Sequence, residues 1–357
     1  MSRSKASEHS AASSATARQA RSASEEQALG RARAAGIHAI AVPTPFQVGR
    51  VNAYLIEDEP LTLIDSGPNS AQALDELEQS LNGLGHAVED LELLVISHQH
   101  IDHFGLAAVL ARRSGAEVAA LGPLAPYLGD FSREAELDDR YAEQMMLRHG
   151  IEPDVATALR SVSESFRGWG SAVSVTRPLS PGQQLHLRDR TLRVYHRPGH
   201  SPSDTVFVDE RRAIMLAADH LIAHISSNPL ITRALGSGET AASNPRPQAL
   251  VTYTESLKAT REMQLSLVLS GHGAPITDHR TLIDERLRLH TRRAGRIREL
   301  LERPLTAHEV AQRLWGDVAV TQAYLTLSEV LGHMDLLTNA GEAVESQRDG
   351  VVRYEAR

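Results

Sequence analysis

The sequence predicts an α/β fold that carries a helical insertion and a small helical domain in its C-terminal part. Short β-rich runs alternate with helical periodicity from residue 37 to residue 121, and strands resume after residue 182. From residue 281 the character changes to charged helices followed by a hairpin pattern. With 357 residues, of which 41% are hydrophobic, the chain can bury a sizeable core.

The first elements are a strand meander, a helix and a buried strand. Residues 37–66 show alternating and β-rich runs broken by turn residues, which indicates a meander. Three leucines at helical spacing predict a helix over 70–83, and the apolar run 91–97 predicts a short buried strand. A helix over 105–115, ending at a glycine, and a strand over 116–121 follow. This order indicates helices packed on a sheet.

Residues 123–170 interrupt the α/β rhythm and form the expected helical insertion. Five apolar residues recur at steps of four and three, on one face of a helix: Val155, Leu159, Val162, Phe166 and Trp169. An earlier helix offers Tyr141, Met145 and Met146. The insertion can be a packed helical element, an apolar lid over a substrate cleft, or both, because Met and aromatic surfaces suit loosely shaped apolar ligands.

Strands and helices alternate again after the insertion. The segments 183–199 and 205–220 each resemble a pair of strands with a polar turn in the middle. A loop rich in Gly and Ser precedes a predicted helix over 248–262, and the apolar run 264–273 predicts another strand. We therefore expect one domain from residue 37 to residue 280.

The segment 281–357 is expected to form a separate domain with a helix-helix-wing pattern. A charged helix over 281–302 leads to Thr306 and Glu309, whose spacing predicts a capping box at the start of a second helix. A further helix over 320–338 precedes a hairpin whose turn contains Asp349 and Gly350. This order resembles a winged helix.

The composition excludes several classes of protein and of site. Because the chain has no cysteine, any metal must be held by His, Asp or Glu. A formal net charge of −8 disfavours nucleic acid as a partner. No apolar run has the length that spans a membrane, and residues 1–36 lack the apolar core of a secretory signal. We expect a cytoplasmic protein in which residues 1–36 form a disordered tail. A cleaved organelle-type presequence is the alternative, which Glu8, Glu25 and Glu26 disfavour.

Ligand-type side chains are concentrated directly after the apolar run at residue 96. The stretch VISHQHIDHFG contains His98, His100, Asp102 and His103 within six positions. A loop that leaves the carboxyl end of a strand is held by a rigid sheet and stays accessible, which is where α/β folds place their sites. The stretch therefore predicts a metal or catalytic site.

Four further ligand-type residues also follow apolar strands. They are Asp65 in LTLIDSG, His200 in RPGHSPSD, Asp219 in IMLAADH and His272 in VLSGHGAPI. Each of them alone is more often a turn cap or a satisfied histidine than a ligand. Because the same arrangement occurs at five strand ends, we expect these side chains to meet in one site.

The donors divide into two sets of three, each able to hold one divalent ion: His98, His100 and His200, then Asp102, His103 and His272. Three protein ligands leave an open position for water. His and carboxylate ligands accommodate Zn, Mn and Fe, of which we expect Zn. The predicted cofactor is therefore a pair of divalent metal ions.

The remaining acidic residues complete the expected site. Asp219 has two carboxylate oxygens and can bridge the two ions, and Asp65 can orient a ligand imidazole by accepting its other N–H. Two ions that share a hydroxide can hydrolyse a bond without a Ser or Cys nucleophile. We expect Asp102, Asp219 and His220 to take part in catalysis. Three further side chains stay open as substrate contacts or as structural residues: Tyr195, His224 and Tyr253.

The ordered combination of HQHIDH, His200, Asp219 and His272 resembles the metallo-β-lactamase superfamily of binuclear hydrolases. The resemblance covers residues 37–280 and implies an αββα sandwich with two metals at one edge. The LIDSG stretch is similar to the family element LIDTG, which implies a site role for Asp65. The absence of cysteine fits the glyoxalase II and lactonase-like branches.

The C-terminal segment resembles the winged-helix appendage of the lactamase-like endoribonucleases. Two features depart from that group: the insertion at 123–170 and the long segment between Asp219 and His272. Both reshape the pocket, so the resemblance does not imply a particular substrate.

Three functions stay open, and the first is preferred. A small, partly apolar ester, thioester or lactone fits the apolar insertion. The first alternative is a metal-dependent phosphodiesterase or ribonuclease, but residues 314–347 contain no Lys or Arg for a duplex. The second alternative is a metal-binding regulator without catalysis. The preferred partners are a small-molecule substrate and a second copy bound through the C-terminal region, with no nucleic acid and no membrane.

Overall fold

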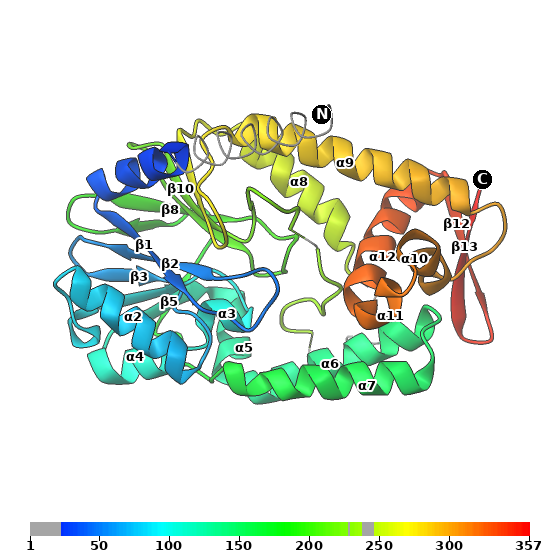
Figure 1. Ribbon diagram of the computed structural model, residues 1–357, viewed down its shortest axis with the longest axis horizontal. Coiled ribbons are helices and arrows are strands. Elements are labelled where there is room, and N and C mark those ends of the chain that lie inside the picture. The colour runs from blue at the N-terminus through cyan, green and yellow to red at the C-terminus, as the bar shows by residue number, and fades with distance from the viewer. Residues whose placement is uncertain (1–22, 228, 238–245) are drawn as a thin grey trace, which may run out of the picture.

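Two mixed β-sheets face each other in the computed structural model, which describes residues 23–227, 229–237 and 246–357 (Figure 1). The first sheet has the order β1-β2-β3-β4-β5-β6: β1 (Ile37–Val42), β2 (Val51–Ile56), β3 (Thr62–Ile64), β4 (Leu93–Ile96), β5 (Glu117–Leu121) and β6 (Arg177–Leu179). The second has the order β11-β10-β9-β8-β7: β7 (Gln184–His186), β8 (Thr191–His196), β9 (Thr205–Asp209), β10 (Ile214–Ala218) and β11 (Leu267–Ser270). Parallel pairing joins β3, β4, β5 and β6, and also β10 with β11.

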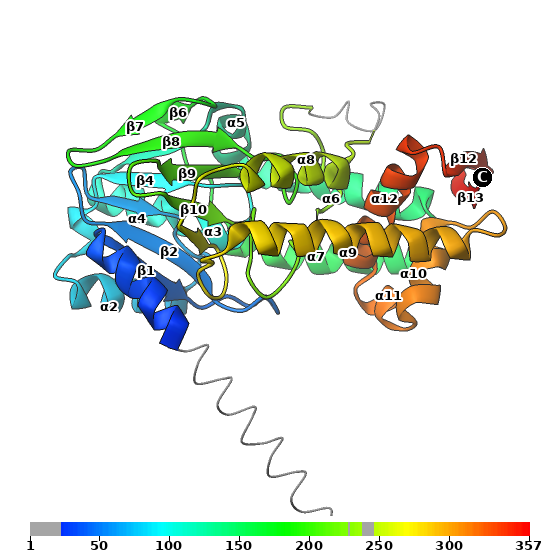
Figure 2. The same cartoon turned by 90° about the horizontal axis from the view of Figure 1, so that it is seen from above.

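Helices cover the outer face of each sheet, so the architecture is an αββα sandwich (Figures 1 and 2). The first sheet carries α2 (Ala71–Gly83), α3 (Ile101–Phe104) and α4 (Ala107–Ser114). The second carries α8 (Ala249–Arg261) and the start of α9 (His279–Leu300). Short 3-10 turns connect other elements: η1 (Val88–Asp90), η2 (Gly122–Leu124) and η3 (Arg167–Trp169).

The central strands are apolar on both faces because each face is buried in a different core. In β4, Leu93 and Val95 pack between the sheets, whereas Leu94 and Ile96 pack against the helices. In β10 the same alternation sends Leu216 between the sheets and Met215 toward α8. Successive strand side chains point to opposite faces, so the continuous apolar runs of the sequence are those of doubly covered strands.

Capping residues fix the start of α2 and the end of α4 close to the positions that the sequence predicts. The Ser70 side chain accepts a hydrogen bond from the backbone N–H of Ala73 and caps the start of α2. Gly115 ends α4 with a φ of 74°, in the left-handed region that favours glycine. These two ends set the lengths of the helices that pack on the first sheet.

The insertion and the C-terminal segment share one apolar core. The insertion forms α5 (Ala125–Gly129), α6 (Phe131–Arg148) and α7 (Pro153–Phe166). The C-terminal segment forms α10 (Ala307–Trp315), α11 (Val318–Thr321), α12 (Ala323–Asn339), β12 (Ala343–Arg348) and β13 (Val351–Ala356). Tyr141 and Met145 of α6 are buried in the same cluster as Val310 and Leu327. In Figure 1, α10 to α12 lie between α9 above and the α6–α7 pair below.

The C-terminal hairpin and the capping box agree with the sequence. The side chain of Thr306 accepts from the backbone N–H of Glu309, and the Glu309 carboxylate accepts from the N–H of Thr306. Asp349 and Gly350 both have positive φ at the turn between β12 and β13. The expected single helix over 320–338 is instead divided at Gln322 into α11 and α12.

The start of the described chain differs from the expected disordered tail. Residues 23–34 are helical, and Ala28 and Ala32 are each only 1% exposed in the core between the sheets. The helix packs closely on the sandwich through these small alanines. Because it buries no large apolar side chains at helical spacing, its sequence lacks the periodic pattern that predicts a helix. Residues 1–22 of the predicted tail lie outside the described residues. No helix in the described ranges is long and apolar enough to cross a membrane.

Candidate metal centre

The predicted ligands lie just beyond the carboxyl ends of five strands, on the connecting loops and on the short helix α3. Asp65 follows β3, the stretch from His98 to His103 follows β4, and His200 follows β8. Asp219 and His272 follow β10 and β11, which are parallel neighbours. Parallel strands end at the same edge of a sheet, so the two sheets bring these loops together at one edge of the sandwich.

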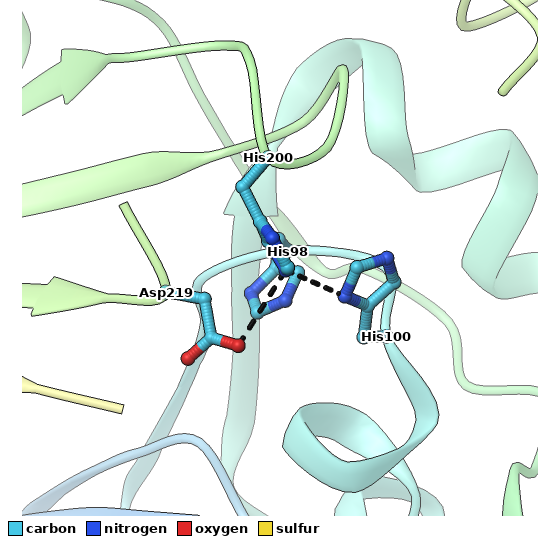
Figure 3. Close-up of side chains that lie close together, drawn as sticks. All are labelled: His98, His100, His200 and Asp219. Carbon is cyan, nitrogen blue, oxygen red and sulfur yellow. Dashed lines mark hydrogen bonds and ion pairs between the residues drawn. The ribbon is translucent and has the colours of Figure 1, made fainter. Parts of the chain in front are cut away.

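One group of four side chains consists of His98, His100, His200 and Asp219, whose potential ligand atoms all lie within 4.8 Å of one another. The Nε2 of His200 lies 2.9 Å from the Nδ1 of His100 and 3.5 Å from the Oδ2 of Asp219 (Figure 3). The ring centroids of His98 and His100 are 4.6 Å apart. Four donors therefore face one small volume.

The second group consists of Asp102, His103 and His272, and Asp219 lies between the two groups. The Nε2 of His272 is 3.3 Å from the Oδ2 of Asp102 and 3.5 Å from the Oδ2 of Asp219. The Nε2 of His103 is 3.4 Å from the Oδ1 of Asp219. The two oxygens of Asp219 thus contact ligands of both groups.

Partners outside the cluster fix which imidazole nitrogen faces inward. The Nδ1 of His103 lies 2.7 Å from the Oδ2 of Asp65, and the Nδ1 of His272 lies 2.9 Å from the carbonyl oxygen of Arg50. Because both partners can only accept, each Nδ1 carries the proton that makes the hydrogen bond. In the neutral ring this leaves the lone pair on Nε2, which faces the cluster.

Ser97 orients His98 in the same way. Its hydroxyl donates to the Oδ2 of Asp65 at 2.8 Å, so its oxygen accepts from the Nδ1 of His98 at 2.9 Å. The Nε2 of His98 is then an acceptor that points into the cluster. Asp65 thereby serves both groups, through His103 directly and through Ser97.

The inward atoms suit metal ions. The Nε2 atoms of His98, His103 and His272 and the Oδ1 of Asp219 are buried and have no hydrogen-bond partner. Buried polar atoms almost always have partners, and several inward lone pairs at one point are satisfied by a cation. The donor set of nitrogen and oxygen atoms is one that Zn, Mn and Fe accept.

Charges in the site favour a cation beside His103. Burial lowers the pKa of His103, but the carboxylates of Asp219 and Asp65 outweigh burial and raise that pKa well above its usual value. Burial and the neighbouring His200 lower the pKa of His100 to about 3, so its ring stays neutral, as a nitrogen ligand must be. His100 thus offers a neutral nitrogen, and the carboxylates around His103 offer compensating negative charge.

A sequence profile of the metallo-beta-lactamase superfamily matches residues 47–272, the span that contains the whole cluster. The chain belongs to this superfamily. It is 32% identical over 319 residues to a Bacillus subtilis protein named "Probable metallo-hydrolase YqjP", across 88% of this chain and 96% of that protein. A crystal structure of a "Beta-lactamase domain protein" from Burkholderia ambifaria is 26% identical and has a TM-score of 0.77, covering 90% of this chain and 92% of that one.

A more distant relative is similar to only part of this chain. The "Atrochrysone carboxyl ACP thioesterase" of Aspergillus fumigatus is 27% identical over 147 residues, which is 41% of this chain and 31% of that protein. The two full-length similarities show that the fold extends beyond the matched span and includes the C-terminal segment.

A cavity of about 730 Å³ opens onto this cluster of candidate metal ligands. His100, Asp102, His200, Asp219 and His272 lie in its lining. The other walls are mainly apolar and come from the segment before β2, from α6 and α7, from the loop after Asp219, and from α12. The volume lies within the usual range for pockets that hold small molecules.

His220 does not join the cluster. It is 1% exposed, its Nε2 lies 2.8 Å from the hydroxyl of Thr260 on α8, and it is not in the cavity lining. Its carbonyl oxygen accepts from the hydroxyl of Tyr253. Tyr195 donates to Glu210 at 2.8 Å. His220, Tyr253 and Tyr195 thus make structural contacts, and His224, which packs over Gly273, is also absent from the lining.

Gly271 lies in the site but was not predicted, because only side chains that can bind a metal were considered in the sequence. A Cβ atom on Gly271 would lie 2.2 Å from the Oδ1 of Asp219 and 2.8 Å from the Cε1 of His103. No real Cβ contact is that short, so a side chain here would displace the carboxylate between the two groups. The glycine just before His272 in SGHG was the available signal.

A third group, His290, Glu329 and His333, lies between α9 and α12. The Nδ1 of His333 donates to the carbonyl oxygen of Glu329 at 2.6 Å, so the Nε2 of His333 is free to accept from the Nδ1 of His290 at 3.2 Å. The Nε2 of His290 faces the hydroxyl of Ser226 at 3.4 Å. The side chain of Glu329 pairs with Arg293. Hydrogen bonds thus satisfy this group without an ion.

Proposed function

We propose that the protein is a metal-dependent hydrolase that cleaves an ester, thioester or lactone bond in a small, partly apolar substrate. The observation that carries this proposal is the convergence of unpartnered lone pairs around Asp219, next to an apolar cavity. His98, His100 and His200 would hold one divalent ion, and Asp102, His103 and His272 a second, with Asp219 shared. Zn is our first choice, and Mn or Fe also fit the donors.

Ions held in this way would supply a hydroxide nucleophile near neutral pH and would polarise the reacting carbonyl. The chain's own contribution is to hold the donors in place. Asp65 and the Arg50 carbonyl fix the rings of His103 and His272, and Asp219 keeps negative charge between the two groups. Apolar side chains form much of the rest of the cavity wall, where they can bury an apolar part of the substrate.

The cavity favours an uncharged substrate over a polyanion. Among its described lining residues, Arg167 is the one Lys or Arg, and it pairs with Asp139. A phosphodiester chain needs cations for its neighbouring phosphates, and this lining offers none that is unpaired. The thioesterase name of the Aspergillus fumigatus relative supports a carbonyl substrate in part of the family.

The C-terminal segment is the feature that suggests a nuclease, because its helices and hairpin follow the winged-helix order. Its third helix, α12, is buried along most of its length, with Leu327, Val330, Leu331 and Met334 all at 0% exposed. A helix buried in this way cannot enter a nucleic-acid groove. We propose that residues 281–357 are a winged-helix-like packing module, with a second copy of the chain as the preferred partner.

Elemental analysis followed by a substrate panel tests the proposed function. We expect about two divalent ions per chain, and chelation should abolish cleavage of acyl thioesters, aryl esters or lactones. Preferential cleavage of bis-aryl phosphodiesters or RNA would replace the proposal by the nuclease alternative. Bound metal with no turnover of any substrate class would support a metal-binding regulator.

A further inference from the structure

We propose that the substrate carries an elongated apolar acyl group and that Leu325 of α12 selects it. This inference rests on the proposed function, because it takes the reacting carbonyl to lie beside the metal ligands. It adds a role for the C-terminal segment: α12 forms a wall of the substrate chamber.

The chamber has its polar end at the metal centre and its apolar walls farther away. Phe131 and Phe166 come from the insertion, Ile222 and Ile225 come from the loop after Asp219, and Leu325 comes from α12. These segments are far apart in the sequence and all contribute to the lining of this cavity. A carbonyl beside the ligands would place its attached chain between them, where apolar atoms bury apolar surface.

Two contacts connect different walls of the chamber. The rings of Phe46 and Phe166 lie 5.5 Å apart, joining the segment before β2 to the end of α7. The side-chain amide of Gln322, between α11 and α12, donates to the side-chain oxygen of Gln47 at 3.4 Å. The C-terminal segment therefore contacts the same loop that carries Phe46.

Exposed apolar side chains in the lining favour an apolar ligand. Leu325 is 42% exposed and Ile225 is 38% exposed, although both are large and hydrophobic. A polar substrate would gain nothing from these side chains, whereas a hydrocarbon chain would cover them. Away from the candidate metal ligands, the acidic side chains of the described lining are paired with arginines, since Asp138 pairs with Arg233 and Asp139 pairs with Arg167.

Leu147 provides a matched control for Leu325. It is the same residue type, is 38% exposed on the surface of α6, and lies outside the chamber lining. Replacing either leucine by Ala removes the same atoms from a helix surface. A difference between Leu325→Ala and Leu147→Ala therefore reports the position of the side chain.

The test measures kcat/KM for aryl esters with acetyl, butanoyl, octanoyl and dodecanoyl groups. We expect kcat/KM of the unmodified protein to rise with acyl length, and Leu325→Ala to lower the octanoyl-to-acetyl ratio by about tenfold. Leu147→Ala should leave that ratio unchanged, and metal content should be equal in all three proteins. No dependence on acyl length, or equal effects of the two variants, would overturn the inference.

A binding measurement separates this inference from the proposed hydrolase activity. Dansyl-undecanoic acid becomes more fluorescent in an apolar chamber, and its binding requires no turnover. If no ester is cleaved but the probe binds and Leu325→Ala weakens it about tenfold, the chamber assignment stands and the hydrolase proposal fails. If esters are cleaved but the probe binds equally to both Ala variants, the chamber assignment fails alone.

Discussion

At the scale of single residues, Asp219 is the side chain that joins the two ligand groups. Its Oδ1 faces His103 and its Oδ2 faces His200 and His272. Burial raises the pKa of Asp219, but the neighbouring histidines outweigh burial and hold that pKa well below its usual value. The carboxylate is therefore negative at neutral pH, where it can balance cationic charge in both groups.

We predict that Asp219→Ala lowers kcat/KM by roughly a hundredfold or more and reduces the bound metal. The variant removes a carboxylate that faces ligands of both groups, so two cations would repel each other without a shared negative charge between them. Metal content and turnover should be measured on the same preparation, with circular dichroism to check the fold. A variant with full metal content and near-normal turnover would contradict the shared role of Asp219.

Most of the candidate ligand residues could be predicted from the sequence because they follow short apolar runs bounded by turn residues, the pattern of a buried strand. His98 after β4 and His272 after β11 follow this rule, and the structure brings both to the same edge. His220 also follows β10, yet it turns away toward Thr260. Neighbouring residues after a strand point in different directions, and sequence spacing alone does not show which one faces the site.

At the scale of elements, the five apolar residues predicted to share one helix face lie in different environments in α7 and η3. Val155 and Leu159 pack against the core shared with the C-terminal segment, and Val162 is 54% exposed. Phe166 lies in the chamber lining, whereas Trp169 lies in η3, outside that lining. The insertion is thus both a packed element and a wall of the cavity, which are the two alternatives that the sequence left open.

We predict that Phe166→Ala changes substrate preference and leaves metal content unchanged. The substitution removes one ring of the Phe46–Phe166 contact and enlarges the chamber without touching a ligand. The kcat/KM for branched acyl esters, which need the space of that ring, should therefore rise relative to that for linear acyl esters of the same carbon number. Val162→Ala, on the exposed face of the same helix, is the control. Equal acyl profiles in the two variants would assign Phe166 a packing role alone.

Contacts between distant elements could not be predicted from the sequence. Leu325 belongs to a helix that looks like a core element, and its place in the chamber depends on how α12 packs beside the loop of Gln47. The strand β6 has only three residues, too few for a period to show. Periodicity identifies elements, whereas tertiary packing decides which of their side chains share a cavity.

At the scale of the whole molecule, a pair of buried histidines joins α9 to α12: His290 contacts His333, and its other ring nitrogen faces Ser226 of the loop after Asp219. Burial lowers the pKa of His290 and of His333 to about 4 each, and the neighbouring Arg293 acts in the same direction. Glu329 opposes the shift but pairs with Arg293. Both rings are therefore neutral in the folded protein at neutral pH.

We predict that the free energy of unfolding falls as the pH decreases from about 6.5 to about 4. The unfolded chain binds protons at these histidines near the usual pKa of 6.5, whereas the folded chain binds them only near 4, so protons favour unfolding in this window. The stabilisation is fully present above the window. Urea unfolding at a series of pH values measures this dependence.

The variant His333→Gln isolates the contribution of the histidine pair. Glutamine can donate to the Glu329 carbonyl and accept from His290 but does not titrate in this range. The variant should therefore show a shallower loss of stability with decreasing pH, while the titration of the metal ligands is common to both proteins. Identical slopes would show that the pair does not control acid sensitivity.

The core shared by the insertion and the C-terminal segment determines which parts of the chain can be removed or transferred separately. The helix α9 is anchored at both ends, with Ile283 in the core beside the second sheet and Ile297 in the core that holds Tyr141 and Val310. Removing the C-terminal segment would uncover the inner face of α6, and removing the insertion would uncover α10. The two segments therefore form a single transferable unit, and any transplant of the chamber onto another sandwich has to carry both.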